Sequence, residues 1–170
     1  MTSDTPAIFI VMGVSGSGKT TVAKALAKQL GCVFYDGDDF HPPENVAKMA
    51  GGQPLDDADR TPWLARLASL IQRHAQRQET AVLACSALKK RYRDELRVTD
   101  QVRFVYLEGD FDLIWQRMVA RAGHYMKPDM LRSQFYALEP PGADEAISIP
   151  ISQSVDEIVT SILAEQANAR

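Results

Sequence analysis

The amino-acid sequence predicts an α/β fold, a three-layer α/β/α arrangement around a mainly parallel, five-stranded sheet. Short, uninterrupted apolar runs are typical of strands buried on both faces of a parallel sheet. Each run is followed by a segment with helical apolar periodicity, so strand and helix alternate five times along the chain. The length of 170 residues suits one domain and hardly two. We therefore expect a single domain over residues 1–170.

The first half of the chain begins with a predicted strand at residues 8–12. A glycine-rich turn leads into a predicted helix at residues 19–30, which has an apolar stripe and ends at Gly31. Residues 32–35 form the second predicted strand. The next helix is expected to begin at Pro62, because proline suits a first helical turn. Its apolar face is formed by Trp63, Leu64, Leu67 and Ile71.

The second half continues the alternation. A strand is predicted at residues 81–85, a helix rich in Lys and Arg at 86–96, and a further strand at 102–107. Asp110 can cap the following helix. The side chains expected to point inward from that helix are Ile114, Trp115, Met118 and Val119.

The last predicted strand covers residues 147–151. Ser154 and Glu157 then form a capping box that opens a final helix. The apolar face of this helix is formed by Ile158, Val159, Ile162 and Leu163.

Composition and charge exclude several classes of protein. Hydrophobic residues make up 45% of the chain and charged residues 24%, and the formal net charge is −3. This balance argues against a general nucleic-acid binder, which needs a basic surface. The apolar runs are too short for a membrane helix, and Met1 to Ala7 do not resemble a signal peptide. We expect a cytoplasmic protein in which Cys32 and Cys85, each within an apolar run, are reduced thiols.

A phosphate-binding loop is the most specific motif in the sequence. Residues 13–20 match the pattern G-x-x-x-x-G-K-[ST] in full, and a predicted strand precedes them while a predicted helix follows. The loop consists of Gly13, Val14, Ser15, Gly16, Ser17, Gly18, Lys19 and Thr20. Its backbone N–H groups and the helix N-terminus can hold phosphates, Lys19 can reach the β- and γ-phosphates, and Thr20 can ligate Mg²⁺. The motif predicts binding of a nucleoside triphosphate.

The phosphate loop alone does not identify the acceptor, since switches, motors and small-molecule kinases share it. A GTPase of this length would carry an Asn-Lys-x-Asp motif, which this sequence lacks. A motor ATPase would be longer. The chain has room for the sheet, a substrate-holding segment and a lid, which together favour a small kinase.

An acidic turn follows the second predicted strand, with Asp36, Asp38, Asp39 and His41 close together in sequence. Ligands bind at the carboxyl ends of strands in parallel sheets, so this turn should face the phosphate loop. One carboxylate can accept the proton of an attacking hydroxyl or hold Mg²⁺ through water, and Asp36 is the better candidate for that outer shell. Another, with His41, can bind the hydroxyls of a polyol. The alternative is a solvated turn without a role.

Arg117 and Arg121 lie four residues apart near the end of a predicted helix and so share a face. A segment with a glycine and a proline follows, and we expect a lid at about residues 121–129. Arginines on a closing lid can stabilise charge on the transferred phosphoryl group. The alternative is a solvated helix end, where basic residues complement the dipole.

Further short motifs complete a pattern that spans the chain from Phe9 to about Ile162. Besides the phosphate loop and Asp36-Gly37-Asp38 with His41-Pro42, they are Lys48-Met49, Gly52-Gln53-Pro54-Leu55-Asp56-Asp57, Asp59-Arg60, Pro62-Trp63-Leu64, Cys85-Ser86-Ala87-Leu88-Lys89, Tyr92-Arg93, Gly123-His124-Tyr125, Ser133-Gln134-Phe135 and Leu138-Glu139. In this order, the set resembles the small P-loop gluconokinases, relatives of shikimate kinase and the nucleoside monophosphate kinases.

The resemblance implies ATP-dependent phosphorylation of D-gluconate at its 6-hydroxyl. The products are 6-phospho-D-gluconate and ADP, Mg²⁺ is required, and the reaction feeds the pentose phosphate or Entner–Doudoroff route. A cytoplasmic homodimer is also implied. It further implies a P-loop kinase domain like that of nucleoside monophosphate kinases, with phosphate loop 13–20, substrate-holding region 36–64 and lid 121–129.

Site roles follow from the same resemblance. Residues 13–20 would hold ATP, with Lys19 catalytic and Thr20 on the metal. Asp36 would be the general base or a water-mediated Mg²⁺ ligand, while Asp38 and His41 contact the substrate hydroxyls.

The remaining roles fall to basic residues. A carboxylate substrate needs a cationic partner, and the candidates are Arg60, Lys89 and Arg93, for each of which an ordinary surface role is the alternative. Arg117 and Arg121 would cover the adenine side and the phosphates, with Arg121 catalytic. Other small-molecule kinases, acting on shikimate or a nucleoside monophosphate, are the first rival interpretation. A regulatory nucleotide-binding module without transfer activity is the second.

Overall fold

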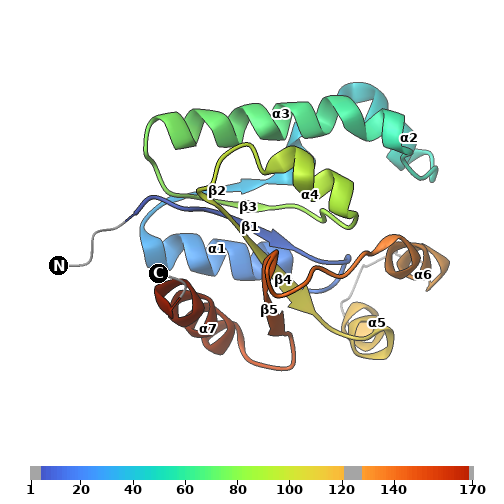
Figure 1. Ribbon diagram of the computed structural model, residues 1–170. Coiled ribbons are helices and arrows are strands. Elements are labelled where there is room, and N and C mark those ends of the chain that lie inside the picture. The colour runs from blue at the N-terminus through green and yellow to red at the C-terminus, as the bar shows by residue number, and fades with distance from the viewer. Residues whose placement is uncertain (1–4, 121–127, 169–170) are drawn as a thin grey trace.

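A single parallel sheet organises the protein, as Figure 1 shows for the computed structural model, which describes residues 5–120 and 128–168. The strands are β1 (Ile8–Met12), β2 (Val33–Asp36), β3 (Ala81–Ala84), β4 (Val102–Glu108) and β5 (Ala146–Pro150). They lie in the order β2-β3-β1-β4-β5, and every neighbouring pair is parallel. The predicted five-stranded parallel sheet is confirmed, with each strand displaced by at most a residue or so.

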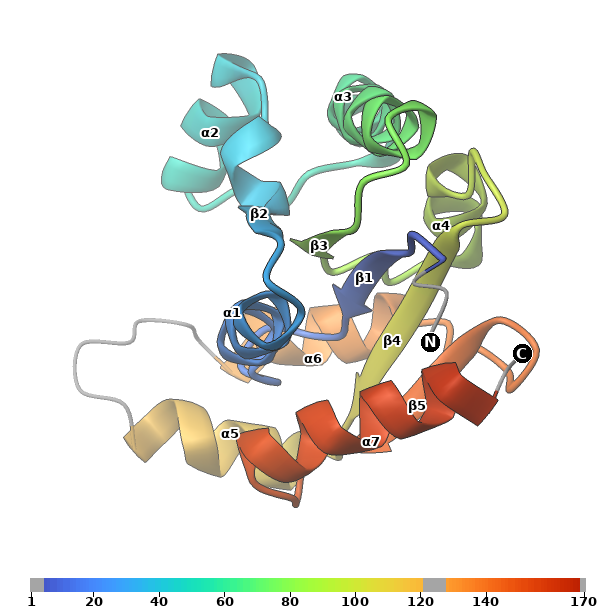
Figure 2. The same cartoon turned by 90° about the vertical axis from the view of Figure 1, so that its left-hand side faces the viewer.

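Helices cover both faces of the sheet. They are α1 (Lys19–Leu30), α2 (Pro43–Ala50), α3 (Asp57–Gln76), α4 (Lys90–Leu96), α5 (Phe111–Ala120), α6 (Pro128–Ala137) and α7 (Val155–Asn168), with a short 3₁₀ helix η1 (Gly37–Phe40). Helices α3 and α4 lie on one face and α1 and α7 on the other (Figures 1 and 2). Helices α2, α5 and α6 lie toward the end of the molecule to which β1 points (Figure 1).

Strand β1 supplies both hydrophobic cores, because successive side chains of a strand point to opposite faces. Ile8, Ile10 and Met12 pack with Trp63, Leu64, Leu67 and Ile71 of α3. Phe9 and Val11 pack with the apolar stripe of α1, which is formed by Val22, Ala23, Leu26 and Ala27. Burial on both faces explains why the strand is an unbroken apolar run rather than an alternating one.

The start of α3 differs from the prediction. The helix begins at Asp57 and contains Pro62, whereas we expected Pro62 in its first turn. Asp56 and Asp59 form a capping box: the Asp56 carboxylate accepts the Asp59 N–H at 2.7 Å, and Asp59 accepts the Asp56 N–H at 2.9 Å. This reciprocal cap satisfies two helix-end donors. It starts the helix before the proline is reached.

The start of α4 also differs, because the segment 86–89 is not helical and the helix begins at Lys90. Ala87 has a φ of 45°, a left-handed conformation that ends helical geometry. The carbonyls of Ala87 and Leu88 accept hydrogen bonds from the guanidinium of Arg93, at 2.8 and 3.1 Å. The buried Arg93 side chain therefore donates to these two carbonyls in place of the backbone N–H groups of the helix that the sequence pattern predicted.

The remaining helix predictions are largely confirmed. The Asp110 carboxylate caps α5 by accepting the Leu113 N–H at 2.8 Å, and Ser154 and Glu157 form the predicted capping box of α7. Val119, predicted to point inward from α5, is instead 63% exposed. The sequence pattern did not predict η1, α2 or α6.

Two further expectations concern the thiols and membranes. Cys85 is buried and Cys32 half-buried, and both are free. Within the described residues, no helix combines the length and the apolar character that crossing a membrane requires.

Candidate active site

A cleft of about 650 Å³ opens where the strands β2 and β3 end. The phosphate loop, the acidic turn and the start of α3 meet around it, and α6 forms a further wall. Residues that line it include Ser15, Gly16, Gly18, Lys19, Thr20, Asp36, Asp38, His41, Arg60, Trp63, Cys85, Ser86, Asp129, Met130, Ser133 and Gln134. The structure thus brings together most of the residues that the sequence analysis proposed for the site.

The phosphate loop has a cleft side and a core side. Of residues 13–20, Val14 and Ser17 are each 2% exposed and hold the loop against the core. Gly16 and Gly18 have φ values of 81° and 92°, which turn the chain into the N-terminus of α1 in a conformation that favours glycine. Gly13 donates its N–H to the Ser86 carbonyl at 3.3 Å, which anchors the loop to the chain after β3. The helix N-terminus beside the cleft favours an anionic ligand.

Lys19 lies at the base of this cleft. Its ammonium donates a hydrogen bond to the Val14 carbonyl at 3.0 Å. Burial lowers the pKa of Lys19, and the negative charges of Asp38 and Asp36 oppose that shift. An ammonium at the base of a cleft is a strong partner for a phosphate.

The acidic turn presents its two carboxylates differently. Asp36 caps η1, because its Oδ1 accepts the Asp38 N–H at 3.0 Å. The Asp38 side chain is 85% exposed and opens into the cleft. The surrounding protein and the nearby charge of Asp36 raise the pKa of Asp38, while His41 and Lys19 act in the opposite direction. A glycine is required between them: a Cβ on Gly37 would lie 2.7 Å from the Ala84 carbonyl oxygen.

His41 lies beside this turn and is 9% exposed. Its ring stacks on Trp63 with the centroids 4.4 Å apart. The Trp63 indole N–H donates to the Gly37 carbonyl at 2.7 Å, which joins α3 to the acidic turn. Burial lowers the pKa of His41, so the imidazole is neutral at pH 7.

Arg60 reaches the cleft from the first turns of α3. One guanidinium nitrogen donates to the Leu55 carbonyl at 2.6 Å and to the Tyr92 hydroxyl at 3.4 Å. The guanidinium also lies over the Tyr92 ring, 5.5 Å from its centroid. The Tyr92 hydroxyl donates in turn to the Asp57 carboxylate. These contacts hold one edge of the guanidinium at the wall of the cleft.

The structure does not bring Lys89 and Arg93 into the lining of the cleft. The Lys89 ammonium is 3.6 Å from Asp57 Oδ1 and pairs with that carboxylate. Arg93 is 1% exposed, and its guanidinium donates to the Glu145 carboxylate and to the Ala87, Leu88 and Glu139 carbonyls. The structure therefore gives no support to the predicted contact between Arg93 and a substrate in this cleft. Four of its five N–H donors join the chain after β3 to Glu139 and Glu145.

Arg117 lies in a second, smaller hollow of about 180 Å³ on the other side of the phosphate loop. Gly16, Gly18 and Thr21 line this hollow too, and Arg117 donates to the Ile151 carbonyl at 2.5 Å. This position suits the predicted role of Arg117 beside the base of a nucleotide. Arg121, predicted to be catalytic, and residues 121–127 of the predicted lid lie outside the described residues.

Gln134 of α6 is a site residue to which the sequence analysis gave no role. Its side-chain Oε1 accepts the Ser15 N–H at 2.6 Å, and its Nε2 donates to the Ser15 hydroxyl at 2.9 Å. The only signal in the sequence was its place in the motif Ser133-Gln134-Phe135. Helix α6 is thus hydrogen-bonded directly to the phosphate loop.

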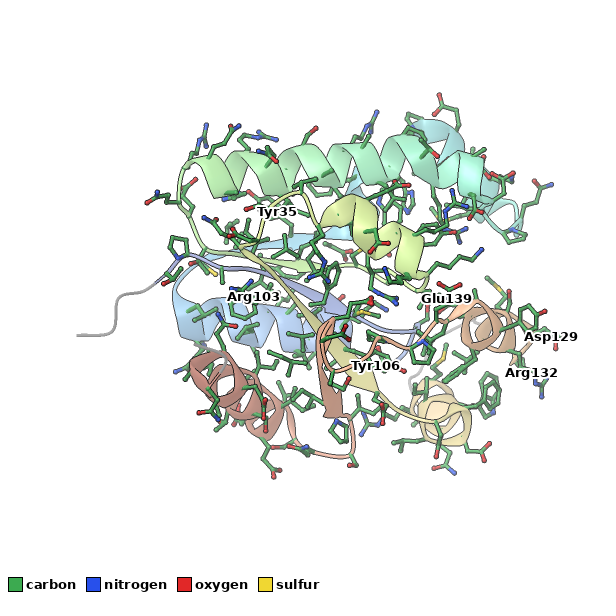
Figure 3. The ribbon with its side chains drawn as sticks, viewed as in Figure 1. Tyr35, Arg103, Tyr106, Asp129, Arg132 and Glu139 are labelled. Carbon is green, nitrogen blue, oxygen red and sulfur yellow. The ribbon has the colours of Figure 1, made fainter. Side chains whose placement is uncertain are left out.

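The chain just after the C-terminus of α6 is tied to α4. The Glu139 N–H donates to the Leu88 carbonyl at 2.8 Å, and the Glu139 carboxylate accepts the Lys90 N–H at 2.7 Å. Figure 3 shows Glu139 between the ends of these two helices. A continuous set of hydrogen bonds therefore runs from the phosphate loop to the N-terminus of α4.

The donor set suits a metal ion that arrives with a nucleotide. The described residues contain no cluster of three or more His, Cys, Asp or Glu side chains that could hold a metal by itself. The Thr20 hydroxyl and the Asp36 carboxylate, both in the cleft, are the oxygen donors that Mg²⁺ prefers. They fit an ion held mainly by phosphates and water.

Comparisons with known proteins agree on one family. The profile described as "Shikimate kinase" matches residues 15–165. The "Probable gluconokinase" of Mus musculus is 44% identical, with 94% of this chain and 97% of the relative covered. The "Thermoresistant gluconokinase" of Escherichia coli K12 is 46% identical, with 92% of this chain and 91% of the relative covered.

Solved structures give the same result. A gluconokinase from Sinorhizobium meliloti 1021 superposes with a TM-score of 0.87 at 43% identity, covering 97% of this chain and 94% of that one. Shikimate kinase from Acinetobacter baumannii, at 20% identity and a TM-score of 0.64, covers 98% of this chain and 96% of that one, and shares the fold.

Proposed function

Because this chain belongs to the gluconokinase family, within the broader group of shikimate kinase-like P-loop kinases, we propose that it transfers the γ-phosphoryl group of ATP to the 6-hydroxyl of D-gluconate. The observation that carries the proposal is the shared cleft, in which the phosphate loop faces two carboxylates, a histidine and an arginine. A nucleotide-binding module without transfer activity would not need this second, acceptor-binding half.

The nucleotide side of the reaction belongs to the phosphate loop. Its backbone N–H groups and the N-terminus of α1 hold the phosphates, and Lys19 stabilises charge on the transferred group. Arg117 lies where the adenine side of ATP would rest, at the hollow behind the loop. Thr20, together with Asp36 through water, would hold Mg²⁺, which supplies neutralisation of phosphate charge.

The acceptor side belongs to the acidic turn and α3. The gluconate O6 attacks the γ-phosphorus, the bond from that phosphorus to the β,γ-bridging oxygen breaks, and ADP leaves. We assign the hydroxyl proton to Asp38, because its carboxylate opens into the cleft and its raised pKa brings it closer to working pH. Asp36, whose Oδ1 caps η1, is then the outer-shell carboxylate.

The substrate carboxylate needs a cation, and Arg60 is the candidate that the cleft contains. Lys89 could contribute only by leaving Asp57. Asp38 and His41 would contact the substrate hydroxyls. The catalytic role of Arg121 and the lid at 121–129 stay predictions, and Arg121→Ala tests the former through loss of turnover.

An acceptor panel tests the activity. ADP release is followed by a coupled assay with gluconate, shikimate, AMP and CMP, with and without Mg²⁺, and Lys19→Ala as the inactive control. We expect turnover with gluconate alone among these acceptors, and loss of it without Mg²⁺. Turnover with shikimate or a nucleotide but not gluconate would refute the substrate assignment. Absence of turnover with every acceptor, in protein that still binds ATP, would favour the regulatory module.

The family also leads us to propose a cytoplasmic homodimer, in the gluconate-utilising route named above. Light scattering after size-exclusion chromatography and cell fractionation test the two parts separately. A monomer at micromolar concentration would remove the dimer without affecting the proposed chemistry.

A further inference from the structure

Asn45 is a buried amide next to the acceptor side of the cleft. It lies in the first turn of α2 and is 3% exposed. Its Nδ2 is 2.8 Å from the Asp59 carbonyl oxygen and 3.2 Å from His41 Nδ1. The sequence analysis gave this residue no role.

The contact with the Asp59 carbonyl shows which atom of the Asn45 side-chain amide is the nitrogen. A backbone carbonyl only accepts hydrogen bonds, so the side-chain atom that faces the Asp59 carbonyl is the amide nitrogen. That carbonyl is held in place, because Asp59 takes part in the capping box and pairs with the Lys48 ammonium at 2.6 Å. The orientation of the Asn45 amide is therefore fixed by the start of α3.

The second contact then fixes the imidazole. The amide nitrogen has a second hydrogen to donate, and His41 Nδ1 faces it. Nδ1 must accept this hydrogen bond, so the proton of the neutral ring resides on Nε2. Stacking on Trp63 holds the plane of the ring, and Nε2 lies 3.8 Å from Asp38 Oδ1. Nε2 is therefore the ring nitrogen whose proton lies near the carboxylate that opens into the cleft.

We propose that Asn45 is a positioning residue that holds His41 as the neutral Nε2–H tautomer, so that His41 donates a hydrogen bond to the acceptor or to Asp38. In this arrangement His41 does not accept the hydroxyl proton. The tautomer is a property of the protein alone, while its use in turnover rests on the proposed function.

The charges around the ring support the neutral form. Burial lowers the pKa of His41, the Arg60 guanidinium on α3 lowers it further, and Asp38 on η1 raises it. On α2 the neighbour is the uncharged Asn45 amide, and the Asp59 carboxylate is paired with Lys48. A proton on Nδ1 would also place two N–H groups against each other. Protonation therefore costs a hydrogen bond in addition to the cost of burial.

Nuclear magnetic resonance of the wild-type protein tests the tautomer directly. Protein labelled with ¹⁵N-histidine shows in long-range ¹H–¹⁵N spectra which ring nitrogen carries the proton, and His74→Gln and His124→Gln variants assign the three residues. We expect His41 as a single Nε2–H tautomer that takes up a proton below pH 6.5. An Nδ1–H tautomer, or a mixture of the two, would overturn the proposal without any variant being needed.

Asn45→Asp tests the role of the amide. A carboxylate at that place favours the imidazolium, and we expect the His41 midpoint to rise by about 1–3 pH units. The matched control is Ala47→Asp, which adds the same charge to an exposed position of α2 and should leave the midpoint within a few tenths of a unit. Equal titration curves in the two variants would contradict the proposal.

Two substitutions of His41 test which nitrogen the reaction uses. In His41→Gln the side-chain amide nitrogen can occupy the Nε2 position, whereas in His41→Asn it reaches only the Nδ1 position. We expect His41→Gln to retain at least about tenfold more kcat/KM for gluconate than His41→Asn, a difference of about 1.4 kcal/mol. Equal loss in both would show that the Nε2–H group is not used. If wild-type protein does not phosphorylate gluconate, the proposed function fails while the spectra still decide the tautomer.

Discussion

At the scale of single residues, Asp36 and Asp38 show how two carboxylates in one turn acquire different roles. The Asp36 Oδ1 atom accepts a hydrogen bond from the backbone N–H of Asp38, whereas the Asp38 carboxylate faces the cleft. The surrounding protein and the nearby charge of Asp36 raise the pKa of Asp38 above its usual value of 3.8. This difference is the reason for which we proposed Asp38, rather than Asp36, as the group that accepts the hydroxyl proton.

Asp38→Asn should therefore remove proton acceptance. As pH falls through the raised pKa, the Asp38 carboxylate is protonated and turnover should decline, which gives the wild type an acid limb above pH 3.8. We expect Asp38→Asn to lower kcat by about 10²–10⁴-fold and to lose that limb. Asp36→Asn should retain the limb and instead require more Mg²⁺. An unchanged limb in Asp38→Asn would assign the base elsewhere.

Arg60→Ala tests the cation assigned to the substrate carboxylate. A charge-assisted hydrogen bond is worth about 1.5–3 kcal/mol, so KM for gluconate should rise by about 10–100-fold. KM for ATP should stay within about twofold of the wild-type value, since Arg60 approaches the cleft from the acceptor side. Arg66→Ala, an exposed arginine two turns away on the same helix, is the control. Similar gluconate kinetics in both variants would contradict the assignment.

At the scale of elements, α6 and the residues that follow it connect the phosphate loop to α4. Gln134 holds Ser15 of the phosphate loop, and Glu139 holds the start of α4. Phe135 packs edge-on against Phe111, 5.8 Å between centroids, and joins α6 to α5. A helix whose C-terminal end is held by these contacts can keep the phosphate loop in one geometry before a nucleotide arrives.

Gln134→Ala should loosen that geometry. Losing two hydrogen bonds of about 0.5–1.5 kcal/mol each should raise KM for ATP by roughly 5–100-fold. KM for gluconate should change less. Steady-state kinetics with each substrate varied separately measure this, and Gln116→Ala on the exposed face of α5 is the control. An effect confined to gluconate would instead place Gln134 on the acceptor.

Arg93→Met should affect stability rather than recognition. The substitution leaves Glu145 and three carbonyls without their buried donor, and the loss of one partner of such a pair costs about 3–5 kcal/mol. Urea unfolding should show this loss, whereas the exposed Arg91→Met should cost at most about 1 kcal/mol. A variant of unchanged stability with a raised KM for gluconate would restore the substrate role predicted for Arg93.

These elements also show how far the sequence could be interpreted. Strands buried on both faces and helices with local caps, such as Asp110 and Ser154, depend on near neighbours in sequence and were predictable. The start of α4 was not, because it depends on Arg93 and on Glu145, 52 residues further on. Arg60 and Arg93 look alike in sequence, and only the tertiary structure separates a cleft residue from a buried one. Asn45 and Gln134 were missed for the same reason.

At the scale of the whole molecule, the phosphate loop lies between two hollows, and we proposed that ATP occupies both. In that proposal the larger cleft would hold the phosphates and the acceptor, and the smaller hollow lies behind the loop beside Arg117. A nucleotide that spans both would tie the N-terminus of α1 to α5 and α7. Binding should therefore stabilise the fold as a unit.

Thermal unfolding tests this coupling. At a concentration of 100 times Kd, a nucleotide that binds only the folded state adds about 2.7 kcal/mol, which corresponds to a rise in Tm of roughly 5–11 °C for a domain of this size. Lys19→Ala should abolish most of the rise with a non-hydrolysable ATP analogue, and Lys28→Ala, exposed in the last turn of α1, should retain it. An equal rise in both variants would remove Lys19 from nucleotide binding.

The joint between the acidic turn and α3 has a consequence for changing what this enzyme phosphorylates. The ties of Trp63 to Gly37, Asn45 to Asp59 and Lys48 to Asp59 all lie within residues 37–63. That stretch contains Asp38, His41 and Arg60 together with these hydrogen bonds and this ion pair. The sheet and the phosphate loop belong to other parts of the chain. To change the acceptor specificity, residues 37–63 should therefore be exchanged together as one segment. Single substitutions would introduce new side chains without the contacts that orient them.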